Sequence, residues 1–383
     1  MDFKFTEEEE KFRKEVREFI QQELPPGWEG HGYLFDFPAQ YWDLRQTIHR
    51  KLKTKGWGPG QNLNEIEKLI MTEEASYWGA PGFSLSNFGE ILVSHFGTEE
   101  QKKRFLPLLT GHEVTFIGLG LSEPNAGSDL AALQTKAVKD GDSYIINGQK
   151  TWQTDAQHAE WTVLLVRTNP NVPKHRGLST ILVDMKTPGI TIQLLRNCYK
   201  EDIFADVFYD NVRVPEINLV GGENKGWQVM PQLLVAERGG AERIGASKRM
   251  LDELVKYAKE TRRNGKTLAE NPLVRQKLAQ LAIEIEAGRW FTYRIAWMQS
   301  KGLLPAIETS VAKLYGGELV QRVGRVGMEI LGLHGQLTAD SKWKALGGKV
   351  QYWSLHTLCR TLGGGSSEMQ RDIIARSLGL PRQ

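Results

Sequence analysis

The chain has few cysteines and lacks a long apolar segment. Its 383 residues include two cysteines, Cys198 and Cys359, which lie far apart in the sequence. This number rules out a disulfide framework and a four-cysteine metal site, and we expect no bound metal. No run of about 18 or more apolar residues is present, so we expect no membrane span.

An excess of charge of one sign is also missing. The chain has 49 basic and 46 acidic residues, a formal net charge of +3, and no block of basic residues. Nucleic-acid binding is therefore not expected. The first residues include four consecutive glutamates, Glu7 to Glu10. A secretory signal needs an apolar core there and an organelle transit peptide avoids acids, so we expect a cytoplasmic protein.

Three common functional motifs are absent. No Gly-x-Gly-x-x-Gly opens a helix after a strand, so a flavin or other dinucleotide would bind outside a Rossmann fold. The His-Glu-x-x-His and Gly-x-Ser-x-Gly patterns are missing too. Metalloprotease and α/β-hydrolase activities therefore lose their main support.

The residues that are present divide the chain into three zones. Helical periodicity dominates residues 6–114, β-branched and aromatic runs dominate residues 115–220, and helical periodicity returns from residue 226. We predict an α+β protein with an N-terminal helical domain over 1–114, a middle β domain over 115–225 and a second helical domain over 226–383.

Local signals predict where several helices begin and end. Thr6 and Glu9 form a capping-box pattern at the start of the first helix. A helix over about residues 241–263 is expected to stop at Asn264-Gly265. The next helix is expected over 272–300, with its proline in the first turn, where the missing N–H is tolerated.

Strand signals are clearest in the middle zone. Ser143–Ile146 and the following Asn147-Gly148 pair predict a β-hairpin with a two-residue turn. Further strands are expected over residues 161–166, 179–183 and 205–214, which are separated by clusters of turn-forming residues.

The segment Leu119–Leu130 is the first candidate for ligand binding. Gly127 and Ser128 follow a turn fixed by Pro124, and small residues there would let backbone N–H groups approach a ligand closely. An ordinary loop between secondary-structure elements would have the same composition. Composition alone leaves both interpretations open.

Four segments together resemble the acyl-CoA dehydrogenase family. They are Leu119–Leu130, Asp142–Thr154, Val212–Gly221 and Gly363–Arg371. The resemblance extends over nearly the whole chain, in the family's order and spacing. It implies a helical N-terminal domain, a middle β-barrel or sandwich domain and a C-terminal four-helix bundle. It also implies FAD as cofactor.

The resemblance also assigns residues to the flavin. The cofactor-binding positions it implies are Leu121, Ser122, Gly127, Ser128, Trp152, Thr154, Ser366 and Glu368. Simple core packing is the alternative for Trp152, since the chain has 11 tryptophans.

The implied reaction is the oxidation of an acyl-CoA to a 2-enoyl-CoA, with electrons passed to an electron-transfer flavoprotein. In many members the catalytic base precedes a glycine of the last motif, but Gly364 occupies that position here. A smaller group, similar to isovaleryl- and long-chain acyl-CoA dehydrogenases, places the base on a helix after the β domain. Glu237 matches that position, and Arg238 matches the adjacent arginine.

Glu237 follows four apolar residues, and an apolar setting raises the pKa of a carboxylate toward that of a useful base. Pairing of Glu237 with Arg238 or Arg243 on a solvated helix face is the alternative, and Glu242 is the rival base. The family also implies a backbone N–H donor to the thioester oxygen at Gly364. Ser128 and Arg238 are expected to contact the substrate.

The residues expected at the adenine end of FAD differ from the family pattern. Thr261 stands where an arginine is usual and Asn264 where an aromatic residue is usual. Pro272 and Glu329 replace two glutamines. Arg262 is the candidate substitute for the arginine, or else a surface cation near a helix C-terminus, where cations are favoured.

The three-glycine motif further resembles sterol-type dehydrogenases that form mixed tetramers of two different subunits. We therefore expect a homo- or heterotetramer. Two other functions stay open: a catalytically silent acyl-CoA- and FAD-binding subunit, and a flavin oxidase or oxygenase. The sequence does not identify the acyl group.

Overall fold

The computed structural model describes residues 4–28, 30, 38–58, 61, 63–83, 87–111, 116–237 and 239–380. Contacts divide the chain into two compact units. We call residues 1–37, 63–83 and 237–383 the helical unit, and residues 38–62 and 84–236 the sheet unit. The predicted domain boundaries at 114 and 225 stay a prediction, because the helices of the first zone are shared between both units.

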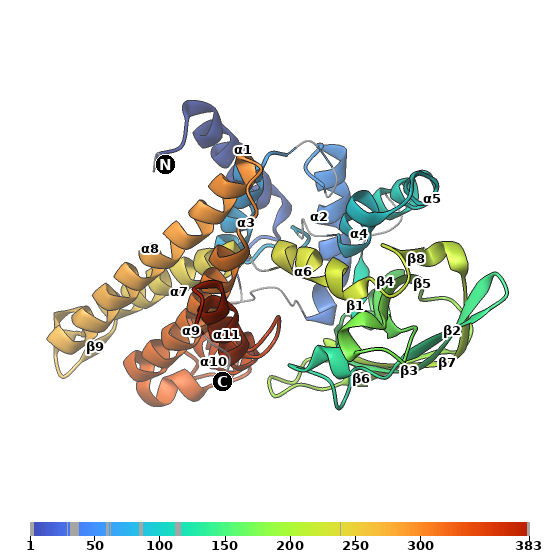
Figure 1. Ribbon diagram of the computed structural model, residues 1–383. Coiled ribbons are helices and arrows are strands. Elements are labelled where there is room, and N and C mark those ends of the chain that lie inside the picture. Colours follow the sequence, from blue (N-terminus) through green and yellow to red (C-terminus); the bar gives the residue numbers. More distant parts are fainter. Residues whose placement is uncertain are drawn as a thin grey trace. The chain divides into compact units, whose positions relative to one another are not determined.

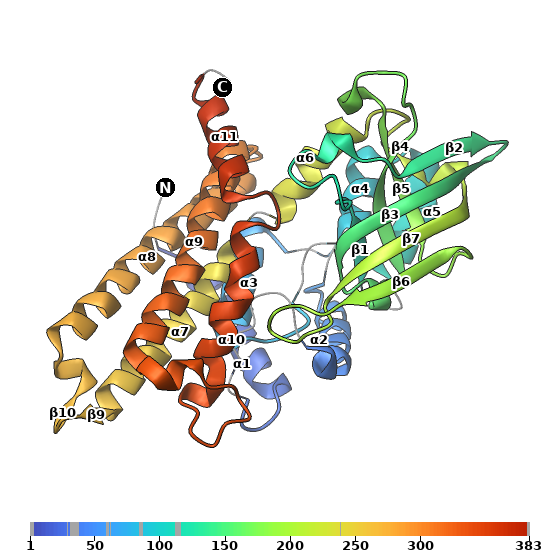
Figure 2. The same cartoon turned by 90° about the horizontal axis from the view of Figure 1, so that it is seen from below.

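Seven α-helices are described in the helical unit, and α7, α8 and α9 run side by side in both views (Figures 1 and 2). Their bounds are α1 Glu7–Glu23, α3 Glu65–Trp78, α7 Ala241–Glu260, α8 Pro272–Ser300, α9 Ala306–Leu331, α10 Lys349–His356 and α11 Ser367–Ser377. The capping box of α1 is confirmed: the Glu9 N–H donates to the Thr6 hydroxyl and the Thr6 N–H donates to the Glu9 carboxylate, over 3.2 and 2.7 Å.

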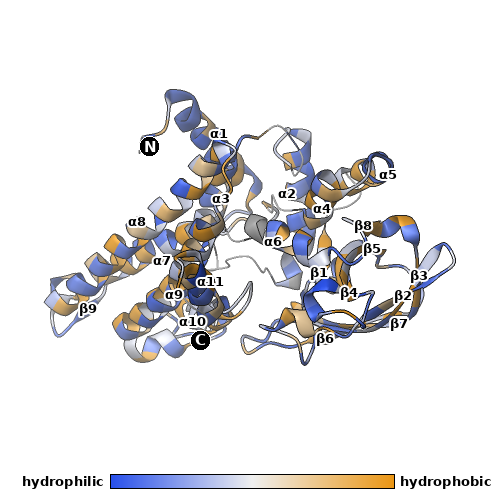
Figure 3. Ribbon diagram, in the orientation of Figure 1, coloured by the Kyte–Doolittle hydropathy of each residue, from blue (hydrophilic) through white to orange (hydrophobic). Residues whose placement is uncertain are grey.

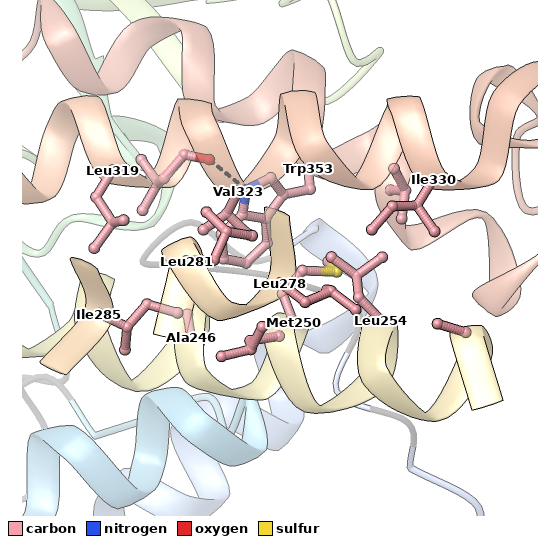
Figure 4. Close-up of a cluster of buried hydrophobic side chains, with 14 of the residues drawn as sticks. Ala246, Met250, Leu254, Leu278, Leu281, Ile285, Leu319, Val323, Ile330 and Trp353 are labelled. Atoms are coloured by element: carbon pink, nitrogen blue, oxygen red, sulfur yellow. Dashed lines mark hydrogen bonds between the residues drawn. The ribbon is translucent and has the colours of Figure 1, made fainter. Parts of the chain in front are cut away.

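The core of the helical unit lies between α7, α8, α9 and α10. Hydrophobic and hydrophilic residues alternate around the long helices, as expected for helices that bury one face (Figure 3). Leu254, Leu319 and Val323 are fully buried there. Trp353 is buried among them, and its indole N–H donates to the Val320 carbonyl over 2.7 Å (Figure 4). Burying each such side chain contributes about 1.5–3 kcal/mol.

The predicted end of the helix that starts at residue 241 was three residues too late. Helix α7 ends at Glu260, and Arg262–Arg263 (β9) pairs with Lys266–Thr267 (β10). Asn264 and Gly265 form the two-residue turn between these strands, with φ angles of 51° and 79°. An Asn-Gly pair suits such a hairpin turn because both residues tolerate positive φ.

The sheet unit is built around one eight-stranded sheet, ordered β6-β7-β3-β2-β4-β5-β8, with β1 paired to β4 (Figure 2). Its strands are β1 Ile117–Gly120, β2 Lys136–Asp140, β3 Ser143–Thr154, β4 Trp161–Arg167, β5 Leu178–Asp184, β6 Ile190–Leu195, β7 Phe204–Pro215 and β8 Leu219–Val220. Its helices are α2 Trp42–Thr54, α4 Phe88–Phe96, α5 Glu99–Thr110 and most of α6 Gly226–Glu237.

Strand β4 is buried on both faces. Val163 and Leu165 belong to a core shared with α4, α5 and α6, whereas Leu164 and Val166 belong to a second core on the opposite face. This division follows from the two-residue period of a strand. The α+β prediction is confirmed, and the strands expected over 161–166, 179–183 and 205–214 correspond to β4, β5 and β7.

The predicted hairpin turn at Asn147-Gly148 is wrong. Strand β3 continues through these residues, with a register shift against β7 between Ile146 and Gly148. A Cβ on Gly148 would lie 2.6 Å from the Thr135 Cα, so glycine is needed there for close approach. The β2–β3 turn lies earlier, at Gly141, whose φ is 63°.

Candidate active site

Two of the motif segments lie against each other within the sheet unit. One follows β1 and contains Leu121 and Ser122; the other is the end of β3. The Thr151 N–H donates to the Ser122 carbonyl over 2.9 Å, and the Lys150 ammonium donates to the Leu121 carbonyl over 2.9 Å. The fold therefore brings together two segments, about 30 positions apart, that each contain residues for which the family resemblance implies flavin contact.

A buried ion pair holds these two segments together. The Lys150 ammonium, fully buried, lies 2.9 Å from the Glu123 carboxylate. The same carboxylate accepts the N–H groups of Gln134 and Thr135 over 2.6 and 2.8 Å. The sequence motifs contain both residues, Glu123 in Leu119–Leu130 and Lys150 in Asp142–Thr154, but gave no sign that the two side chains form a pair.

The pair has perturbed pKa values. Burial lowers the pKa of Lys150 to about 8, against the opposing attraction of Glu123. Burial would raise the pKa of Glu123, but Lys150 and the hydrogen bonds from residues 134 and 135 outweigh it and lower that pKa. The carboxylate therefore stays charged, which is consistent with the three donors around it.

Trp152 protrudes from a strained position on β3. Its φ is 60°, a conformation that costs a non-glycine residue about 1–3 kcal/mol, and the pairing with β7 is irregular between Lys150 and Gln153. The side chain is 62% exposed and contacts the Phe204 ring edge-on, with centroids 6.1 Å apart. Trp152 is thus not a core residue, and Thr154, two residues on, is half-buried.

Gly127 and Ser128 are exposed and directly follow a turn at residues 124–125. The turn is closed by Glu123 and Ala126, whose N–H groups each donate to the other residue's carbonyl over 3.1 and 3.0 Å. A Cβ added at Gly127 would meet no atom within 4 Å. The space beside this glycine is therefore open to a bound molecule.

The other predicted residues belong to the helical unit, where Glu237 ends α6. The position of the Glu237 side chain and the whole of Arg238 lie outside the described residues. Gly240 follows with a φ of 80°, and a Cβ on it would lie 3.7 Å from Ala312 of α9. The rival, Glu242, is buried and paired with Arg243 at 2.7 Å.

The three-glycine segment also lies against α9. Gly364 and Gly365 have φ angles of 69° and 92°, and the Lys313 ammonium donates to the Gly365 carbonyl. Ser366 caps α11 by accepting the Met369 N–H over 3.3 Å. The pKa of the exposed Glu368 is lowered by a hydrogen bond with its own backbone and by one with Ser366.

Arg262 lies apart from these residues. It is exposed, on the β9–β10 hairpin, and donates to the Gly265 carbonyl over 3.0 Å. Helix α7 separates this hairpin from Gly240, and its 20 residues span about 30 Å. Glu329, at the other position that departs from the family pattern, forms an ion pair with Lys277. Arg262 therefore cannot reach the Glu237 end of α7 within the same chain.

Two further features are absent from the described residues. No group of three or more His, Cys, Asp or Glu side chains there could hold a metal ion. None of the helices in that part of the chain combines the length and apolar character needed to cross a membrane.

Comparison with protein families gives three matches in order along the chain. Residues 6–113 match the N-terminal domain of acyl-CoA dehydrogenase, residues 118–212 its middle domain and residues 224–379 its C-terminal domain.

Individual proteins match over the full length. The chain is 35% identical to acyl-CoA dehydrogenase FadE26 of Mycobacterium tuberculosis, covering 100% of this chain and 99% of that protein. The structure of the ChsE4-ChsE5 complex from Mycobacterium tuberculosis is similar at a TM-score of 0.88, with 32% identity and full coverage of both chains. The Tcur3481-Tcur3483 steroid ACAD is similar at a TM-score of 0.87, with 28% identity and full coverage of both chains.

Proposed function

The chain belongs to the acyl-CoA dehydrogenase family of FAD-dependent oxidoreductases, and from this premise we propose that it oxidises an acyl-CoA to a 2-enoyl-CoA with Glu237 as the base. One observation carries the choice of base: the segment after Glu237 and the Gly363–Gly365 segment contact adjacent residues of α9. Gly240 lies against Ala312, and Gly365 accepts from Lys313.

The residues of the sheet unit fit an FAD ring and its linker. Trp152 offers an exposed aromatic face, and Gly127 leaves open space beside exposed Ser128. The hydrogen bonds and ion pair around Glu123 fix both segments before any ligand binds. We propose that Leu121, Ser122, Gly127, Ser128, Trp152 and Thr154 hold the cofactor, with Ser366 and Glu368 contacting it from the last motif. When bound, FAD accepts the hydride from the β-carbon.

The chain's own residues then supply the proton chemistry. Glu237 takes the proton from the α-carbon, and a positioned general base contributes about 10²–10⁴-fold to such a step. The electron pair left behind moves toward the thioester oxygen, which accepts the Gly364 N–H. Losing one such donor typically costs on the order of 10²–10³ in rate. Arg238 and Ser128 are proposed to contact the substrate.

The acyl group can be identified with purified protein and a panel of acyl-CoA thioesters. Under nitrogen, a substrate should bleach the flavin absorbance, and Glu237→Gln should keep FAD but lose the bleaching, because an amide cannot take the α-proton. Glu242→Gln is the matched control and should keep bleaching. An active Glu237→Gln enzyme would show that Glu237 is not the base, and no bleaching by any panel member would contradict the dehydrogenase proposal.

Assembly with a second kind of subunit is the alternative to a homotetramer. Since Arg262 lies about 30 Å from the start of α7, an arginine for this chain's flavin would come from another chain, either a second copy or a related subunit. Two structural relatives are described as complexes or pairs of two named proteins. In this alternative the chain binds acyl-CoA and FAD only as one part of a heteromeric dehydrogenase.

Native mass spectrometry of the chain purified alone distinguishes the two assemblies. A homotetramer with a full complement of FAD would remove the need for a different partner. Low FAD content that rises when a related subunit is co-expressed would support the heteromer. We propose an electron-transfer flavoprotein as electron acceptor and the cytoplasm as location.

A further inference from the structure

We propose that Lys313 and Gln370 are positioning residues that hold the Gly364 N–H in place as the donor to the thioester oxygen. The inference rests on the proposed function, in which Gly364 supplies that donor. The two side chains act through the backbone: they bind the carbonyl groups of Gly364 and Gly365, and the proposal gives them no contact with the substrate.

The backbone at Gly364 needs such support. Three consecutive glycines, Gly363 to Gly365, have more backbone freedom than any other residues and lose the most entropy on being fixed. Gly364 and Gly365 both adopt positive φ angles. A rotation of the peptide between Gly363 and Gly364 would turn the N–H away from a substrate.

The peptides on both sides of that peptide are held. On one side the Gly363 N–H donates to the Cys359 carbonyl over 2.9 Å. On the other side, the Gln370 amide donates to the Gly364 carbonyl over 3.3 Å. The next peptide along the chain is held at the Gly365 carbonyl, which accepts from Gln370 over 3.2 Å and from Lys313. These bonds fix the two ends between which the peptide with the Gly364 N–H is held, and so restrict the orientations that this N–H adopts.

The burial of both side chains points to a specific role. Gln370 is fully buried and Lys313 is 1% exposed. Burying an ammonium group is costly unless it is paired or hydrogen-bonded. The positive charge of Lys313 also acts on the same segment, since it contributes to lowering the pKa of Glu368, after the hydrogen bonds to that carboxylate and after Arg371. The same charge would favour negative charge on the thioester oxygen.

Lys313 also lies next to the segment that carries the base. Its neighbour Ala312 lies 3.7 Å from the Cβ position of Gly240, three residues after Glu237. One turn of α9 thus contacts the segments that carry the base and the oxygen donor. Lys313 is well placed to fix their separation.

The test measures the ionisation of a bound ligand, apart from turnover. The 3-oxoacyl-CoA analogue of the best panel substrate ionises to an enolate, whose absorbance can be followed against pH. Lys313→Met and Gln370→Leu should move this ionisation to a pH higher by about one, a tenfold effect, because the oxygen donor is less well placed. The kcat should fall about 10- to 100-fold with KM and FAD content nearly unchanged.

Lys53→Met is the matched control. Lys53 is also buried, and its ammonium donates to the Gly111 carbonyl over 2.7 Å, a contact that includes no proposed site residue. This variant should lose stability but keep the ligand ionisation of the wild type. If Lys313→Met fails to fold, Gln370→Leu and the charge-retaining Lys313→Arg carry the test.

The outcomes separate the two proposals. A wild type that oxidises a panel member, together with folded variants whose ligand ionisation is unchanged, overturns the positioning role alone. A wild type that neither oxidises any panel member nor ionises the analogue overturns the proposed function and this inference with it.

Discussion

At the scale of single residues, the Glu123–Lys150 pair links two segments proposed to bind the flavin. Buried ion pairs are weak sources of stability when intact, but removing one partner leaves an uncompensated charge and costs about 3–5 kcal/mol. Its geometry, with three donors on the Glu123 carboxylate, explains why a charge can be kept inside the sheet unit.

Lys150→Met should therefore destabilise the protein and weaken flavin binding. We expect the free energy of unfolding to fall by about 3–5 kcal/mol and FAD content to drop, because Glu123 is left buried without its cation. Urea unfolding and flavin absorbance measure the two effects. The double variant Glu123→Gln/Lys150→Met should recover part of the stability; equal losses in both variants would show that the charge itself is unimportant.

Glu123 also gives the stability a dependence on pH. Its pKa lies below the ordinary value of 4.5 in the folded protein. Its contribution is therefore complete above pH 4.5 and is lost as the pH falls through the lower folded value. In urea unfolding between pH 6 and about pH 3, Glu123→Gln should lose less stability than the wild type. Parallel curves would contradict this assignment.

At the scale of secondary-structure elements, the irregularity on β3 sets how far Trp152 protrudes. Strained backbone of this kind is often found at functional sites. Residues of β3 on both sides of Trp152 are held in place. Lys150 is bound to Glu123, and the Gln153 amide donates to the Thr162 hydroxyl over 3.2 Å.

Trp152→Gly should separate stability from flavin binding. Glycine adopts positive φ without strain, so the free energy of unfolding should change by no more than about 1 kcal/mol. FAD affinity should fall at least about tenfold, because an aromatic face is lost. Thermal unfolding and flavin titration provide the two values. Lys200→Gly, at another exposed residue with positive φ, is the control and should leave FAD affinity unchanged.

Elements whose ends depend on nearby residues were predicted well from the sequence. Thr6 caps α1 and Pro272 begins α8, since each signal acts within one helical turn. The Asn147-Gly148 pair led to a wrong turn prediction. Glycine is needed at position 148 because the backbone of Thr135, from another part of the chain, leaves no room for a Cβ. Asn264-Gly265 was recognised as a break, but the short hairpin it forms was not.

The candidate site was only partly predictable for a similar reason. Motifs identified Trp152 and the loop at Gly127, but not the ion pair that holds them, because a buried pair depends on which strands meet. The assignments of Glu237, Gly364 and the flavin-contacting residues stay predictions. The resemblance to the family and FAD as its cofactor are confirmed by the matches along the chain.

At the scale of the whole molecule, exposed large apolar side chains are concentrated in the helical unit. Leu304, Leu333 and Trp343 are each more than half exposed. Exposed apolar residues of this size often mark contacts with other chains. A tetramer is typical of this family's fold, and we expect the helical unit to supply much of its interface.

Leu304→Glu and Leu333→Glu should therefore weaken the assembly. A charge buried at a subunit contact without a partner is unfavourable, so smaller species should appear in native mass spectrometry or light scattering. Val138→Glu, at an exposed position of the sheet unit, is the control and should leave the mass unchanged. A tetramer that persists in both variants would place the interface elsewhere.

The interleaving of the two units has a consequence for synthesis on the ribosome. All residues of the sheet unit have been made once residue 236 is reached, so this unit can fold before translation ends. Helices α1 and α3 complete their packing only when residues 237–383 have been made, because these residues form the rest of the helical unit. Until then α3, which carries the fully buried Ile70 and Met71, lacks its contacts with α7 and α8, although α1 and α3 can pack against each other. The helical unit is thus completed only after the whole sheet unit has been made.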